Sequence, residues 1–144
     1  MRKVARYMYV ATSWVLLAWV LITIFMAGMA LFVRTPYWET HREVGWGAGL
    51  PLLLLILAGL LGWIPRRLTA WLVAVIVFHT LHISLPALKT TLPLAAAIHP
   101  LSATLLAWLT LTHARRAQQL LLGRPEADVP VAHEPGGAAI AQSG

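Results

Sequence analysis

The sequence predicts an all-α membrane protein, an antiparallel up-down-up-down four-helix transmembrane bundle with both termini in the cytoplasm. Of its 144 residues, 59% are hydrophobic and only 11% are charged, which is far from the balance of a soluble domain. Runs without Asp, Glu, Lys or Arg cover residues 7–33, 44–65, 68–88 and 90–114. Each run supplies the roughly 20 mostly apolar residues that one membrane crossing needs.

The charged residues indicate how these spans are oriented. Basic residues lie before the first span, between the second and third, and after the fourth: Arg2, Lys3, Arg6, Arg66, Arg67, Arg115, Arg116 and Arg124. The other side carries Arg34, Arg42 and Lys89, offset by Glu39 and Glu43. Because cytoplasmic loops are enriched in Lys and Arg, we expect a multi-pass protein of the cytoplasmic membrane with both termini inside. This distribution accounts for the net charge of +6 without a nucleic-acid partner.

Each span is predicted to be one helix that a short connection joins to the next. We place the helices at about 9–33, 38–63, 69–88 and 92–113, in a single domain over 1–122. Short connections make sequential helices antiparallel neighbours. The first apolar stretch exceeds the roughly 7–15 residues of a signal-peptide core, so we expect it to be retained. The remainder, 123–144, is rich in Gly, Pro and Ala without apolar periodicity, which predicts a disordered cytoplasmic tail.

Histidines inside the apolar runs are the candidate functional residues, because polar groups are costly within a membrane span. At a rise of about 1.5 Å per residue, His41, His82 and His99 each lie about 8–10 Å below the outer ends of the second, third and fourth helices. His79 lies one turn deeper than His82 and shares its face. We expect the first three to converge in one layer near the outer face, where Gly28 of the first helix allows close approach of a helix or a flat ligand.

Paired imidazoles on facing helices can hold haem inside a helical bundle. In the simplest ring of four helices the second and fourth are diagonal, so we expect His41 and His99 as axial ligands, with His82 or His79 as the competing second ligand. Arg42 at the outer rim suits a haem propionate. The chain has no cysteine, which excludes disulfides, iron–sulfur clusters and covalent haem attachment. No carboxylate lies inside the spans, so hydrolytic acid–base chemistry has little support.

Two further positions carry expectations of their own. Pro100 follows His99 directly and is expected to bend the fourth helix there. His113 lies beside Arg115 and Arg116, and we expect it to be interfacial. A second, cytoplasmic-side haem is not expected, because the second helix has no histidine at the matching level.

Short motifs resemble those of a group of uncharacterised prokaryotic membrane proteins with four helices. They are Ala27-Gly28 near the end of the first helix, His41-Arg42-Glu43-Val44-Gly45 at the opening of the second, and Ile98-His99-Pro100-Leu101-Ser102-Ala103 at the start of the fourth. The resemblance covers about residues 5–122 and implies a shared fold and a shared outer site. More generally, the layout is similar to that of membrane b-type cytochromes, in which alternate helices of a four-helix core supply paired axial histidines. That similarity implies one bound haem b.

The first functional hypothesis is a small membrane b-type cytochrome, an electron carrier or redox subunit rather than a stand-alone enzyme. Its partners would be a quinone or a redox partner subunit. One alternative is a non-enzymatic scaffold or accessory subunit whose histidines bond between helices, and another is a transporter or proton relay along His79, His82 and His99. The same histidines would also suit copper or another small metal. With four helices, the scaffold or relay roles would require a homo- or hetero-oligomer.

Overall fold

The computed structural model describes residues 1–123, and this part of the chain is built from helices, with no strand. The elements in chain order are α1 (Arg2–Phe32), α2 (Tyr37–Gly47), α3 (Gly49–Gly62), α4 (Arg66–Ser84), the 3-10 helix η1 (Leu85–Lys89), α5 (Pro93–Ala97) and α6 (His99–Leu122). The all-helical fold class is confirmed. The tail expected over 123–144 lies, apart from Gly123, outside the described residues.

Three helical segments of the described chain are long and apolar enough to cross a membrane: Arg2–Phe32, Tyr37–Gly62 and Arg66–Lys89. They correspond to the first three expected spans. The fourth expected span, 92–113, is divided between α5 and α6. α6 is long enough to cross, but its second half carries His113, Arg115 and Arg116, which lowers its hydropathy below that of the other three segments.

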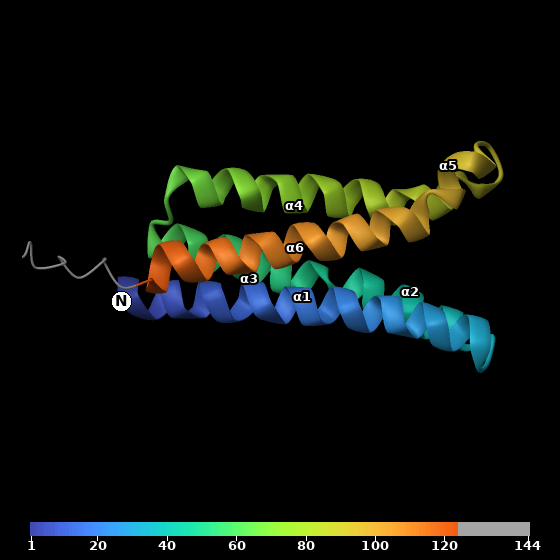
Figure 1. Ribbon diagram of the computed structural model, residues 1–144, viewed down its shortest axis with the longest axis horizontal. Coiled ribbons are helices and arrows are strands. Elements are labelled where there is room, and N and C mark those ends of the chain that lie inside the picture. The colour runs from blue at the N-terminus through green and yellow to red at the C-terminus, as the bar shows by residue number, and fades with distance from the viewer. Residues whose placement is uncertain (124–144) are drawn as a thin grey trace, which may run out of the picture.

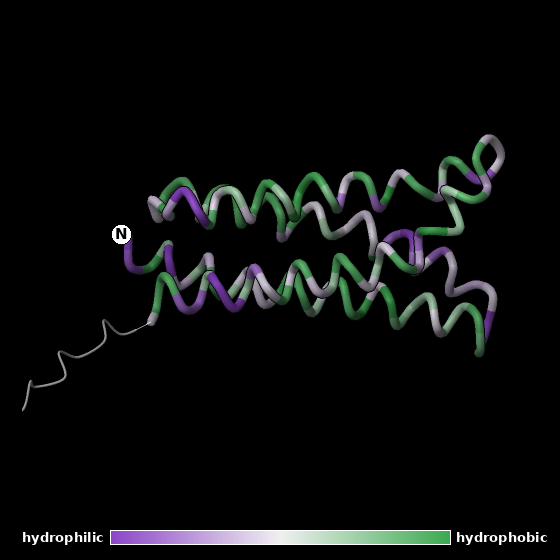
Figure 2. The backbone as a smooth tube through the Cα atoms, turned by 45° about the horizontal axis from the view of Figure 1, so that its top comes forward, coloured by the Kyte–Doolittle hydropathy of each residue, from purple (hydrophilic) through white to green (hydrophobic). Residues whose placement is uncertain are grey.

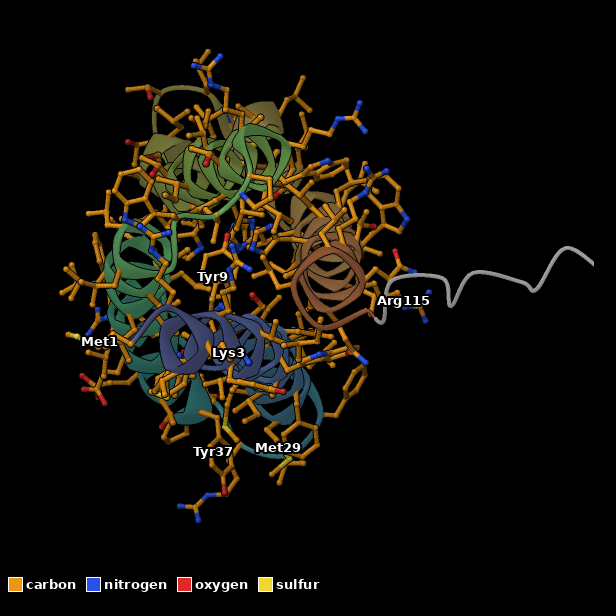
Figure 3. All side chains as sticks on the ribbon, turned by 90° about the vertical axis from the view of Figure 1, so that its left-hand side faces the viewer. Met1, Lys3, Tyr9, Met29, Tyr37 and Arg115 are labelled. Atoms are coloured by element: carbon orange, nitrogen blue, oxygen red, sulfur yellow. The ribbon has the colours of Figure 1, made fainter. Side chains whose placement is uncertain are left out.

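The long helices lie side by side, and α1, the consecutive helices α2 and α3, α4 and α6 run in alternating directions (Figure 1). α1 packs along α2, α3 and α6, and α4 packs along α6. The N-terminus, the α3–α4 turn and the end of α6 share one end of the molecule, which we call the basic end. The α1–α2 turn, η1 and α5 share the opposite end (Figure 1), which we call the histidine end. Viewed from the basic end, Tyr9 points into the space between the helices (Figure 3).

The expected second helix is interrupted at Ala48, between α2 and α3. Pro51 has no N–H to donate to the carbonyl of Gly47 four residues earlier, so it fits the first turn of a new helix better than the middle of an old one. The break leaves the Val44 carbonyl without the N–H of Ala48, which turns to Gly45 and Trp46 instead. Trp19 of α1 supplies the missing donor, because its indole N–H donates to the Val44 carbonyl oxygen at 2.7 Å.

Prolines also shape the connection between α4 and α6. Pro86 cannot donate to the His82 carbonyl, and α4 tightens there into η1, with Leu85 bonding to that carbonyl as a cap. Pro100 lies in the first turn of α6, which begins at His99. The expected bend at His99 is therefore a break at Ile98, because proline is tolerated at a helix start but not in its interior.

The outward surface of the bundle is apolar. Leu60, Leu81 and Trp108 are 70%, 61% and 61% exposed, and Figure 2 shows hydrophobic residues along much of each long helix. Large contiguous apolar surfaces are rare on soluble monomers, so lipid suits this surface better than water. The core beneath it includes the fully buried side chains Tyr9, Leu16, Leu55, Leu68 and Val75.

Candidate functional site: a histidine cluster

Three of the predicted histidines meet at the histidine end. His41 comes from α2, His82 from the last turn of α4, and His99 from the first residue of α6. The His41 and His99 ring centroids are 6.3 Å apart with an interplanar angle of 88°. The His82 and His99 rings are stacked at 4.1 Å and 13°. Trp38 covers the cluster from the α1–α2 side, with its ring centroid 5.6 Å from that of His41.

The Nδ1 atom of each of these three rings has a fixed hydrogen-bond partner. In His41 it lies 2.8 Å from the carbonyl oxygen of Thr23 on α1. In His99 it lies 3.1 Å from the carbonyl oxygen of His82. Backbone carbonyls only accept hydrogen bonds, so both Nδ1 atoms carry the proton and donate it.

The third ring, His82, reaches the same state through a serine. Its Nδ1 lies 2.7 Å from the hydroxyl oxygen of Ser102. That hydroxyl already donates to the carbonyl of His99 at 2.8 Å, so towards His82 it acts as the acceptor. His82 therefore also donates from Nδ1.

Protonated Nδ1 atoms have a chemical consequence at the other ring nitrogen. In a neutral imidazole with its proton on Nδ1, the Nε2 atom has a free lone pair. No hydrogen bond of Nε2 is found for His41, His82 or His99 within residues 1–123. Histidines that bind metals almost always donate the opposite N–H to a carbonyl or carboxylate in this way. The cluster therefore presents lone-pair donors whose rings are held in orientation.

The cluster is arranged for two ligands rather than three. No group of three or more His, Asp or Glu side chains in the described part of the chain is placed to hold one metal ion. The near-parallel stack of His82 on His99 prevents these two rings from pointing at one ion from opposite sides. His41 and His99, with perpendicular rings further apart, do not have this obstacle.

The remaining predicted site residues do not join the cluster. His79 is buried, and its Nδ1 has no hydrogen-bond partner among the described residues. A side chain at Gly28 would meet nothing within 4 Å, so the space beside it is open. Arg42 is exposed and pairs only with Glu39 of its own helix, at 3.3 Å.

Sequence reasoning did not identify the groups that orient the rings. The Thr23 carbonyl gives no sequence signal, because any residue has a carbonyl. Ser102 stands three residues after His99, and a hydroxyl one turn from a buried histidine is a signal that could have identified it. Pro86 gives such a signal, because a proline cannot donate to the carbonyl four residues earlier, which here is the His82 carbonyl that His99 uses.

His113 differs from its expected interfacial position. It is fully buried, as is Tyr9 of α1, and the Tyr9 hydroxyl lies 3.2 Å from His113 Nε2. The His113 Nδ1 atom is buried without a partner among the described residues.

The fold and the site together define a class, an all-helical membrane protein with a cluster of oriented histidines at one end. Residues 23–87 match the model of a family of unknown function, DUF6220. This match covers the last third of α1, all of α2, α3 and α4, and the start of η1, and it is consistent with the expected resemblance to an uncharacterised family. No curated protein and no solved structure is significantly similar to the chain.

Proposed function

We propose that this protein is a small integral-membrane b-type cytochrome that binds one haem through His41 and His99. The observation that carries the proposal is the pair of neighbouring, Nδ1-tethered rings, for whose Nε2 atoms no hydrogen bond is found within residues 1–123. A metal between two imidazoles lies about 2 Å from each nitrogen, so the ring centroids would be about 6 Å apart. The separation of 6.3 Å agrees with this value.

The surrounding residues support the same assignment. Bound haem supplies reversible one-electron transfer. His41 and His99 would hold it and fix its orientation, because their Nδ1–H groups bond to backbone carbonyls of α1 and α4. Trp38 shields the His41 ring on one side. Arg42 is exposed next to His41, where a guanidinium suits a propionate.

The proposal includes an orientation in the membrane. α6, entered through α5, would complete a fourth crossing, and the basic end would face the cytoplasm according to the positive-inside rule. The histidine end would then lie near the outer face of the cytoplasmic membrane. A quinone in the bilayer or a redox partner subunit would exchange electrons with the site, in a homo- or hetero-oligomer.

A spectrum of the purified protein tests the proposal. The full chain, expressed with haem supply and purified in detergent, should give a sharp low-spin α band in the dithionite-reduced minus oxidised difference spectrum. His41→Ala and His99→Ala should each abolish this band, while His79→Ala and His82→Ala should leave most of it. A colourless, well-folded preparation would overturn the proposal. Loss of the band only in the His79 and His82 variants would overturn the ligand pair.

A structural role is the second candidate, and a specific observation favours it. Each clustered histidine bonds from one helix to another, His41 to α1, His82 to α6 and His99 to α4. Such bonds are worth about 0.6–2 kcal/mol each in membrane proteins. A non-enzymatic scaffold would be colourless, and its alanine variants would lose stability without any spectral change.

A further inference from the structure

The basic end contains a small cavity between α4 and α6 that the proposed electron-transfer function does not use. Its volume is about 320 Å³, and it is lined by Arg67, Ala70, Trp71, Ala74 and Arg116. The two arginines come from helices that are distant in the sequence, so the packing of α6 on α4 creates the cavity. The sequence alone indicates Arg67 only as an orientation signal.

The electrostatics of this cavity favour an anion. Arg116 lies over the Trp71 ring, with its guanidinium carbon 4.4 Å from the ring centroid, which holds that cation at the cavity by a cation–π contact. Arg67 lines the same space. Within residues 1–123 the only carboxylates are Glu39 and Glu43, both at the histidine end. No described side chain therefore neutralises the two guanidinium groups.

The walls of the cavity also suit a hydrocarbon chain. Ala70 and Ala74 are one turn apart on α4, and their small, exposed side chains line the cavity. Val77, an exposed apolar residue, lies one turn further along the same helix towards the middle of the bundle. The site therefore combines two cations with small and apolar side chains spaced along α4.

We propose that this cavity binds an anionic phospholipid of the surrounding leaflet. The phosphate would lie between Arg67 and Arg116, each of which can donate two parallel N–H bonds to phosphate oxygens. One acyl chain would follow Ala70 and Ala74. Basic pockets between transmembrane helices on the cytoplasmic side are a recognised setting for such headgroups. The site is independent of the histidine cluster, at the opposite end of the helices.

Native mass spectrometry of the full chain in detergent tests this site by titration with phosphatidylglycerol and phosphatidylcholine. Phosphatidylglycerol should bind in preference. Arg67→Gln and Arg116→Gln should each weaken its binding about fivefold, as expected for one basic residue at an anionic surface. Arg115→Gln is the matched control, because Arg115 is an exposed neighbour that does not line the cavity. The double variant of Arg67 and Arg116 is compared with a Lys3→Gln, Arg115→Gln double variant of equal charge.

Three results would overturn the inference. The first is equal loss of binding in the two double variants, which would show a general charge effect. The second is equal binding of phosphatidylcholine. The third is displacement of the lipid by millimolar inorganic phosphate, which would make the site one for soluble anions. Circular dichroism of each variant checks that the helices are intact, and the exposure of both arginines makes folding of the variants expected.

Discussion

The Nδ1 atom of His99 lies 3.1 Å from the carbonyl oxygen of His82, which has no N–H partner four residues later because residue 86 is proline. This carbonyl accepts the N–H of Leu85, and the missing donor at residue 86 leaves it open to a second donor, the ring of a histidine on another helix. The same ring stacks on the His82 side chain at 4.1 Å. His99 is therefore held on two sides by α4, and its Nε2 atom remains available.

Replacing Pro86 with alanine should weaken this arrangement. The new N–H at residue 86 would compete with His99 for the His82 carbonyl and would favour continuation of α4. If His99 is a haem ligand, we expect the Pro86→Ala protein to retain less haem per polypeptide than the parent. The haem-to-protein ratio after purification measures the effect. Pro93→Ala, at the start of α5, is the control and should retain the parental ratio; equal loss in both variants would contradict the prediction.

Ser102→Ala tests the acceptor of His82. The change leaves the Nδ1–H of His82 without a partner in a buried position, and an unsatisfied buried donor costs about 1–3 kcal/mol. Thermal or denaturant unfolding in detergent should show this loss. Ser84→Ala removes an exposed hydroxyl that bonds only within α4 and should change stability by less than about 0.5 kcal/mol. A Ser102→Ala protein as stable as the Ser84→Ala protein would contradict the assigned bond.

The Tyr9–His113 pair predicts a result for a double substitution. Tyr9→Phe alone removes the 3.2 Å contact to His113 Nε2 and should destabilise by about 1–3 kcal/mol, because both ring nitrogens of a fully buried histidine are then unsatisfied. Adding His113→Leu removes the stranded polar group, so we expect the double variant to regain part of the loss. Tyr7→Phe, at a 62% exposed position, controls for loss of a hydroxyl. If the double variant has a clearly lower free energy of unfolding than Tyr9→Phe, the two side chains do not interact as described and the prediction is wrong.

Two glycines near the α2–α3 break should respond oppositely to alanine. A Cβ at Gly47 would lie 2.8 Å from Cζ2 of Trp19, whereas one at Gly49 would meet nothing within 4 Å. Gly47→Ala should therefore displace the indole from the Val44 carbonyl and cost about 1–3 kcal/mol. Gly49→Ala should raise the free energy of unfolding, by no more than about 1 kcal/mol. Unfolding in detergent measures the stability of each variant, and tryptophan fluorescence reports on the displacement of Trp19. Equal stability of the two variants would contradict the predicted contact between a Cβ at residue 47 and Trp19.

The apolar runs and their length fix the helical class, because a helix satisfies every backbone group without water. The sequence also indicates which histidines lie at the same depth in the membrane, because each residue advances a helix by a fixed rise. Depth along each helix predicts that His41, His82 and His99 meet, and in the structure the rings of His41 and His82 both lie next to that of His99. Pro100 was also readable as a disturbance of the helix at His99.

Only the tertiary structure decided the rotation of each helix about its axis and the partner of each polar atom. The orienting carbonyls of Thr23 and His82 belong to every residue type alike, so no side-chain pattern marks them. His113 appears interfacial by its sequence neighbours but is buried because α6 turns that face towards Tyr9. The pairing of Arg67 with Arg116 in one cavity depends on helix packing between segments distant in the chain. Periodicity and hydropathy determine what lies in the membrane and how deep it lies, and side-chain contacts between helices determine which of those residues meet.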